Sequence, residues 1–179
     1  MKERVARWQV AGVVFASVLG TFLHFLFDLT GGSPAAALVS AVNESIWEHM
    51  KLLFYPLLLF SIPEYFVWGR DQSYFWWIKL AGTLLGLGLI PVLYYTYTGI
   101  LGRSADWFNI AIFFIAAGIV FRAETAAFQN GIRCPLPGWP AILLLCLISL
   151  LFTVLTFSSP RIPLFRDPVT GTYGFRKLF

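Results

Sequence analysis

The sequence predicts an all-α membrane protein with five transmembrane helices and one short interfacial or re-entrant helix. Of its 179 residues, 58% are hydrophobic and only 12% are charged. Soluble domains average about 45–50% apolar and about 25% charged residues. The mean hydropathy is +0.74, and several windows supply the roughly 20 apolar residues that a helix needs to cross a bilayer. We expect residues 1–179 to form a single transmembrane helical domain.

The first span is expected at about residues 8–28. Its apolar run is too long for a cleaved signal peptide, and no small-residue cleavage site follows it. The Gly31-Gly32 pair should end the helix. Pro34 then suits the first position of a helix, where a missing N–H costs nothing. We therefore expect a short interfacial or re-entrant helix at 34–43, too short to cross the membrane.

Four further spans follow in the sequence. Ser45 and Glu48 form an S-x-x-E capping box, which indicates that a new helix begins at Ser45. The four spans are expected at residues 45–69, 73–99, 105–121 and 140–157.

The last segment, residues 158–179, is too polar for the hydrocarbon core and too rich in aromatic residues for a disordered tail. We expect it to pack back on the bundle, where it could act as a lid. Its expected apolar anchors are Phe165, Tyr173 and Phe175.

Lysines and arginines in short loops predict a cytoplasmic amino terminus in the cell (inner or plasma) membrane. The connection at 29–47 holds no lysine or arginine and should lie outside. The net charge of +4 suits contact with anionic lipid headgroups better than contact with nucleic acid. The basic residues assigned to the cytoplasmic side are Lys2, Arg4, Arg7, Arg70, Arg122 and Arg133.

Polar residues form a regular stripe on the first span. Ser17, Thr21, His24 and Asp28 follow the spacing 4, 3, 4, which places them on one helical face. Such a stripe indicates a face turned towards other helices. In the alternative interpretation the two hydroxyls bond their own backbone and Asp28 marks the helix end.

A second polar cluster is the stretch NESIWEHMK at 43–51. Glu44, Glu48 and Lys51 share one helical face, and His49 lies on a neighbouring face about 100° around the helix. Capping by Glu48 and a Lys51 side chain that reaches the membrane surface would explain two of these residues without chemistry. Glu44 and His49 stay unexplained.

Depth links the two clusters. His24 lies one turn before the end of the first span and His49 one turn after the start of the second, about 6 Å below the same membrane face at 1.5 Å per residue. They are the two histidines of the chain. Other polar residues expected at this level are Tyr94, Tyr95, Tyr97, Asp106 and Asn109. The charges of the opposite face are interpreted as solvated boundary residues, namely Glu64, Arg70, Asp71, Arg122 and Glu124.

Two imidazoles with nearby carboxylates are good ligands for Zn²⁺ or another divalent metal. The expected ligands are His24, Asp28 and His49, with Glu48 or Glu44 as general base for a metal-activated water. This set predicts a metal-dependent hydrolase that acts on a lipid or amphipathic substrate at headgroup level. The expected substrate-binding residues are Asn43, Ser45, Lys51, Tyr95, Asp106 and Asn109.

Two other classes of function fit the same residues. Buried acidic groups and histidines also occur in small-solute or proton-coupled transporters, and a satisfied polar network is typical of accessory subunits. Haem ligation by the two histidines is a further variant. A hydrolase needs a metal and a lateral opening to lipid, a transporter needs access from both aqueous sides, and an accessory subunit needs neither.

At NESIWEHMKLLFYP and at the ending PRIPLFRDPVTGTYGF the chain resembles an uncharacterised family of small prokaryotic multi-pass membrane proteins classed as a domain of unknown function. The resemblance covers most of the chain and implies a membrane location and fold. Through Ser45-x-x-x-His49 and a nearby aspartate, the chain is also similar to intramembrane zinc hydrolases of the ceramidase and adiponectin-receptor type. It departs from them in having five spans in place of seven and no late His-x-x-x-His pair.

Overall fold

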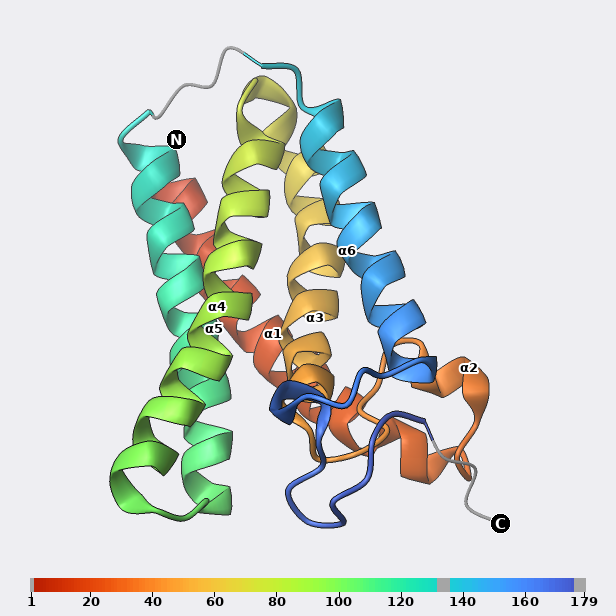
Figure 1. Ribbon diagram of the computed structural model, residues 1–179. Helices are drawn as coiled ribbons and strands as arrows, with labels where there is room; N and C mark the ends of the chain where they lie inside the picture. Colours follow the sequence, from red (N-terminus) through yellow and green to blue (C-terminus); the bar gives the residue numbers. More distant parts are fainter. Residues whose placement is uncertain (1, 132–135, 176–179) are drawn as a thin grey trace.

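Five long helices form the body of the protein in a computed structural model that describes residues 2–131 and 136–175, with the side chain of Asp106 also outside the description (Figure 1). All five are long and apolar enough to cross a membrane, which confirms the predicted class and number of spans. They are α1 Lys2–Leu29, α3 Ile46–Val67, α4 Phe75–Leu101, α5 Asp106–Gln129 and α6 Trp139–Phe157. The shorter elements are α2 Pro34–Ala37 and the 3₁₀ turns Gly69–Asp71 and Pro163–Phe165.

The central helix of the bundle is α3. It packs against α1, α4 and α6, while α5 lies against α1 and α4. Of the five spans, α3 has the largest share of buried residues. At one end of the bundle, α2, the α4–α5 turn and the carboxyl-terminal segment lie together (Figure 1).

Three helices differ from their expected bounds by more than two residues. α1 begins at Lys2, six residues before the expected start of the first span. α5 continues to Gln129, well beyond the expected end at Phe121, because Glu124 is buried inside the bundle rather than solvated at a helix end. The expected helix at 34–43 is a single turn, α2, followed by irregular backbone up to Ser45. Ser45 caps α3 as predicted: its hydroxyl accepts a hydrogen bond from the Glu48 N–H at 3.4 Å.

The buried face of α1 is shifted by one residue from the polar stripe. Ala16, Gly20, Leu23 and Phe27 point into the bundle, one position before each of the four polar residues. One residue turns a helix by 100°, so the polar stripe lies at the border of the packed face. Thr21 is exposed and bonds its own helix through the carbonyl oxygen of Ser17 at 2.8 Å, as the alternative interpretation expects.

Glycine brings α1 close to its neighbours. A Cβ atom on Gly20 would lie 2.8 Å from the backbone carbonyl oxygen of Leu52 in α3 and would also meet the Phe113 ring of α5. Small residues at helix interfaces allow such close approach in membrane bundles, where association depends on packing.

The carboxyl-terminal segment folds back over the end of the bundle that holds α2. Phe165 is buried, with its ring centroid 4.6 Å from that of Trp47. The Phe175 ring lies 5.9 Å from the Phe27 ring, and the Phe175 N–H donates to the carbonyl oxygen of Thr156 at 2.8 Å. Tyr173 packs partly buried against the main core. These contacts place the segment beside the end of α1, the start of α3 and the end of α6.

The close approach at Gly20 predicts a packing defect on enlargement. Gly20→Ala should lower the free energy of unfolding by about 1–3 kcal/mol, because the rigid carbonyl of Leu52 cannot move aside. The measurement is the unfolding midpoint in detergent. The matched control is Gly88→Ala in α4, where a Cβ meets nothing within 4 Å and stability should hold or rise. Equal midpoints for the two variants would contradict the packing assignment.

Candidate metal site

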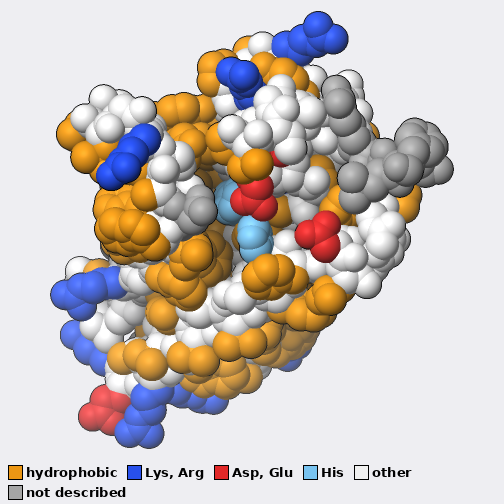
Figure 2. Space-filling model, turned by 90° about the horizontal axis from the view of Figure 1, so that it is seen from below, with side chains coloured by type: hydrophobic (Ala, Val, Ile, Leu, Met, Phe, Trp, Pro, Cys, Tyr) orange, Lys and Arg blue, Asp and Glu red, His pale blue; other side chains and the backbone are white. Residues whose placement is uncertain are grey.

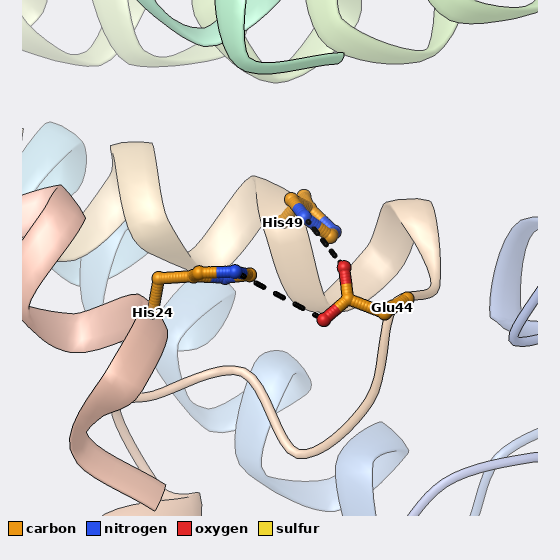
Figure 3. Close-up of side chains that lie close together, drawn as sticks. All are labelled: His24, Glu44 and His49. Atoms are coloured by element: carbon orange, nitrogen blue, oxygen red, sulfur yellow. Dashed lines mark ion pairs between the residues drawn. The ribbon is translucent and has the colours of Figure 1, made fainter. Parts of the chain in front are cut away.

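Three potential metal ligands meet at the end of the bundle that the carboxyl-terminal segment covers (Figure 3). His24 comes from α1, His49 from α3, and Glu44 from the connection that precedes α3. The Nε2 atom of His49 lies 3.4 Å from Oε2 of Glu44, and the Nε2 atom of His24 lies 3.9 Å from Oε1 of the same carboxylate. One ligand atom from each residue lies within 4.8 Å of the others.

Local structure positions each of these side chains. His24 follows Leu23 at the border of the packed face of α1, so its ring reaches the edge of the bundle rather than the lipid. His49 lies one turn into α3, and its Nδ1 atom is 3.0 Å from the carbonyl oxygen of Ser45. With Nδ1–H donating to this oxygen, the Nε2 lone pair of His49 faces Glu44. Backbone carbonyls hold metal-binding histidines in this way in many proteins.

The connection before α3 fixes the backbone next to Glu44. The side-chain oxygen of Asn43 accepts a hydrogen bond from the Ser45 N–H at 2.9 Å, and its amide donates to the carbonyl oxygen of Gly174 at 3.1 Å. Both side chains are thus engaged in hydrogen bonds within the protein, and neither lines the cavities described below. Both were expected to bind substrate.

The ligand set fits a divalent ion. Bonds of about 2.0–2.2 Å in a tetrahedral zinc site separate neighbouring ligand atoms by about 3.3–3.5 Å. The His49–Glu44 distance of 3.4 Å has this value, but it is to Oε2, whereas the His24–Glu44 distance of 3.9 Å is to Oε1. With one ligand atom from each residue, the three atoms lie within 4.8 Å of one another, so the side chains would move closer together around a bound ion. All three are partly exposed.

Two cavities flank the three residues. The larger, of about 430 Å³, lies between α1 and α5 and is lined by both histidines, Glu44, Asn109 and several phenylalanines. The smaller, of about 160 Å³, extends towards Tyr94 in α4. Val169 of the carboxyl-terminal segment lines both cavities. Figure 2 shows the histidines at the bottom of a hollow with hydrophobic side chains around it.

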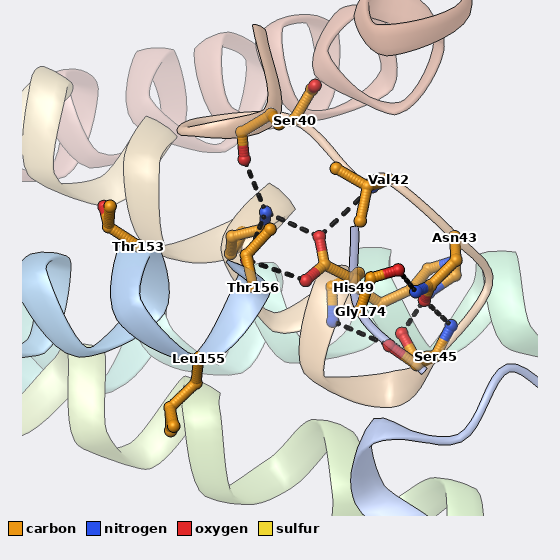
Figure 4. Close-up of polar contacts among 12 residues, drawn as sticks. Ser40, Val42, Asn43, Ser45, His49, Thr153, Leu155, Thr156 and Gly174 are labelled. Atoms are coloured by element: carbon orange, nitrogen blue, oxygen red, sulfur yellow. Dashed lines mark hydrogen bonds and ion pairs between the residues drawn. The ribbon is translucent and has the colours of Figure 1, made fainter. Parts of the chain in front are cut away.

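Glu48 does not belong to this cluster. It is fully buried and forms an ion pair with Lys51 at 2.5 Å. Glu48 also accepts hydrogen bonds from the Thr156 hydroxyl of α6 at 2.8 Å and from the Val42 N–H at 3.1 Å, and Figure 4 labels these two partners. Lys51 donates to the carbonyl oxygen of Ala37 at 2.9 Å. The expected roles of Glu48 as general base and of Lys51 in substrate binding do not fit these positions, because the two buried charges pair with each other.

Other expected site residues also take different positions. Asp28 is exposed and lies outside the group of three ligands that the described residues form, because it is one turn beyond His24. Tyr95 is 42% exposed on α4, and its neighbour Tyr94 lines the cavity instead, a difference of 100° around the helix. Asn109 lines both cavities. The expectation for Asp106 concerns a side chain outside the described residues.

Sequence reasoning missed a second buried cluster at the opposite end of the bundle. Glu64 and Glu124, interpreted above as solvated boundary charges, are 0% and 1% exposed and both pair with Lys79 of α4. Gln9 of α1 donates to Glu64 at 2.9 Å. The available signal was Lys79 itself, since a lysine within an apolar span is rarely without a buried partner.

The comparisons with known proteins identify a family but no activity. A family model described as "Family of unknown function (DUF6512)" matches residues 1–175. No curated protein and no solved structure matches the chain. The similarity to ceramidase-type zinc hydrolases is thus not shown, whereas the resemblance to an uncharacterised membrane family is confirmed.

The Glu48–Lys51 pair makes a stability prediction. Lys51→Met leaves a buried carboxylate without its cation and should lower the free energy of unfolding by about 3–5 kcal/mol. The double variant Glu48→Leu/Lys51→Met, which removes both charges, should recover most of this loss. The readout is denaturant-induced unfolding in micelles, with exposed Lys2→Met as the control. A double variant less stable than Lys51→Met would contradict the pairing.

Proposed function

The chain belongs to DUF6512, a family of unknown function, and we propose that it is a metal-dependent hydrolase that cleaves a lipid or amphipathic substrate at the extracytoplasmic face of the membrane. His24, His49 and Glu44 are the metal ligands in this proposal, with Glu44 in the place expected for Asp28. Two histidines and one glutamate are a known ligand set of catalytic zinc, which keeps a further position for water or substrate.

The observation that carries the proposal is the cavity beside the ligands. It lies between α1 and α5, and its outer wall is formed by Phe25, Ile110 and Phe114, which are 53%, 60% and 42% exposed. Exposed apolar side chains on membrane spans face lipid, so an acyl chain can enter the cavity from the side. Its volume of about 430 Å³ lies within the usual range of ligand pockets.

The residues have distinct roles in the proposed reaction. The bound metal would act as a Lewis acid on the scissile carbonyl or phosphoryl group and activate a water molecule. Glu44 has two carboxylate oxygens in the site, so one can ligate while the other accepts the proton of the attacking water. Asn109 lines both cavities. Its Oδ1 accepts from the Tyr97 hydroxyl and its Nδ2 donates to the Ser104 hydroxyl at 3.0 Å, which leaves the second N–H of the amide for the substrate headgroup.

The same geometry favours zinc over haem and a hydrolase over an accessory subunit. The Glu44 carboxylate lies between the two imidazoles, where a haem would have to fit. A lateral opening next to a ligand cluster is required for a lipid hydrolase and has no role in an accessory subunit.

In this proposal the protein lies in the cell membrane with its amino terminus in the cytoplasm. The start of α1 carries Lys2, Arg4 and Arg7, while the connection from α1 to α3 has no lysine or arginine. The histidine cluster then faces outwards, at headgroup level. Labelling of a cysteine introduced at residue 170 by a membrane-impermeant reagent should occur from outside the cell, and labelling only from the cytoplasmic side would reverse this orientation.

Metal binding is tested first on the purified full chain. After loading with zinc and removal of excess metal, the wild type should retain one zinc ion per chain, and His24→Ala, His49→Ala and Glu44→Gln should each lower retention at least about tenfold by removing one of three ligands. Asp28→Asn is the matched control and should retain zinc. The measurement is elemental analysis. A wild type without metal, or His variants that keep it, would overturn the site.

Hydrolysis is tested separately, with a panel of fluorogenic ester, amide and phosphodiester lipid analogues in micelles. The zinc-loaded wild type should cleave at least one of them, a chelator should abolish cleavage, and added zinc should restore it. Asn109→Ala should raise KM more than it lowers kcat, because Asn109 contacts substrate and not the metal. Zinc-loaded protein that cleaves none of these classes would rule out the hydrolase while leaving the metal site intact.

A further inference from the structure

A second set of ionisable groups lies in the bundle core, at the end opposite the histidines. Gln9 of α1, Glu64 of α3, Lys79 of α4 and Glu124 of α5 come together there, and each is at most 2% exposed. Lys79 Nζ lies 2.9 Å from Glu64 Oε2 and 2.5 Å from Glu124 Oε2. Lys79 is one turn into α4, so the cluster lies about 6 Å below that end of the helix.

The charges of this cluster do not balance. The charged groups that face Glu124 are Lys79 from α4 and Glu64 from α3, and α1 contributes the neutral amide of Gln9. Two carboxylates and one ammonium leave one net negative charge in a buried site. The Glu48–Lys51 pair at the other end, by contrast, has one charge of each sign. An uncompensated charge in a membrane interior is strongly unfavourable, and binding of one proton removes it.

Hydrogen bonding indicates which carboxyl group takes the proton. Both oxygens of Glu64 are acceptors already, Oε1 from the Gln9 amide and Oε2 from Lys79. Glu124 uses only Oε2, and its buried Oε1 atom has no hydrogen-bond partner among the described residues. The side-chain oxygen of Gln9 is also buried, and it too has no hydrogen-bond partner among the residues that the structure describes. A proton on Glu124 Oε1 turns one of these two acceptors into a donor.

The Glu124 carboxyl group also borders a cavity whose other lining residues are uncharged. This cavity of about 270 Å³ between α4 and α5 is lined by Glu124 together with Tyr74, Trp77 and Gly82. Gly82 has no side chain at this point, and a Cβ there would lie 2.8 Å from Glu124 Cγ. The carboxyl group therefore occupies the space that a larger residue would fill, at the inner wall of the cavity.

From the charge imbalance, the unpartnered oxygen and the cavity we infer that this cluster is a proton-binding site, in which Glu124 takes up and releases one proton through the space between α4 and α5. Lys79 and Glu64 form the fixed ion pair of the site. The unpartnered side-chain oxygen of Gln9 is the acceptor available to the protonated Glu124. The site is separate from the proposed metal centre and requires none of its residues.

Infrared difference spectroscopy on the full chain in lipid vesicles tests the proton. The wild type should show the C=O stretching band of a protonated carboxyl group that disappears on alkalinisation. Glu124→Gln, a neutral mimic of the protonated state that should fold, should lose this band. Glu48→Gln is the matched control, a buried carboxyl group in a balanced pair, and should keep it. A wild type without the band, or a band unchanged in Glu124→Gln, would overturn the proposal.

A chemical label locates the proton independently. Dicyclohexylcarbodiimide is apolar, and a protonated carboxyl group adds across one of its N=C bonds to give an adduct that rearranges to a stable N-acylurea. We expect mass spectrometry of the labelled protein to find the adduct on Glu124, with labelling lost in Glu124→Gln. Glu64→Gln leaves Lys79 and Glu124 as a balanced pair and should reduce labelling at Glu124 severalfold. An adduct on Glu64 in place of Glu124 would contradict the assignment.

Discussion

Neutralisation of charge in a medium of low polarity determines how this bundle is assembled. The central helix α3 carries Glu48 and Lys51 near its start and Glu64 near its end, and all three are buried. At the start of α3, the Glu48–Lys51 pair forms hydrogen bonds with Ala37 of α2, with Val42 of the α2–α3 connection and with Thr156 of α6. At the end of α3, Glu64 bonds Gln9 of α1 and Lys79 of α4, and Lys79 also pairs with Glu124 of α5. The buried charges of α3 are thus bound to every other helix.

Two groups of polar residues at the α2 end of the bundle differ in how they are held in place. The Glu48–Lys51 pair is balanced and satisfied by backbone and hydroxyl groups, so it stabilises one arrangement of the chain. His24, His49 and Glu44 lie outside that pair, partly exposed beside a cavity. The buried pair gives the proposed site a fixed support next to it, which binding sites need.

Much of the fold could be predicted from the sequence because spans are defined by composition over long windows. The common depth of His24 and His49 was predictable as well, since connectivity alone places them near one membrane face. The set of three ligands could not be predicted from the sequence. Asp28 and Glu44 differ in whether they reach the histidines, and this depends on the irregular backbone between α2 and α3, which no periodicity describes.

The burial of Glu64 and Glu124 could not be predicted from the sequence for a different reason. A carboxylate near the end of an apolar run has the same local sequence whether it meets water or a lysine of another helix. Only the tertiary contact with Lys79 separates the two cases. The one-residue shift of the α1 stripe has a similar origin, because glycine and alanine at Gly20 and Ala16 define the packed face without any polar signal.

The Asn43 side chain joins the carboxyl-terminal segment to the backbone beside Glu44, since it bonds Gly174 with one end and Ser45 with the other. A force or a binding partner that lifts this segment would pull on the same amide group that holds the start of α3. The carboxyl-terminal segment is therefore joined through one side chain to the backbone that carries Glu44, and loss of the Gly174 hydrogen bond would free the same side chain that accepts from the Ser45 N–H.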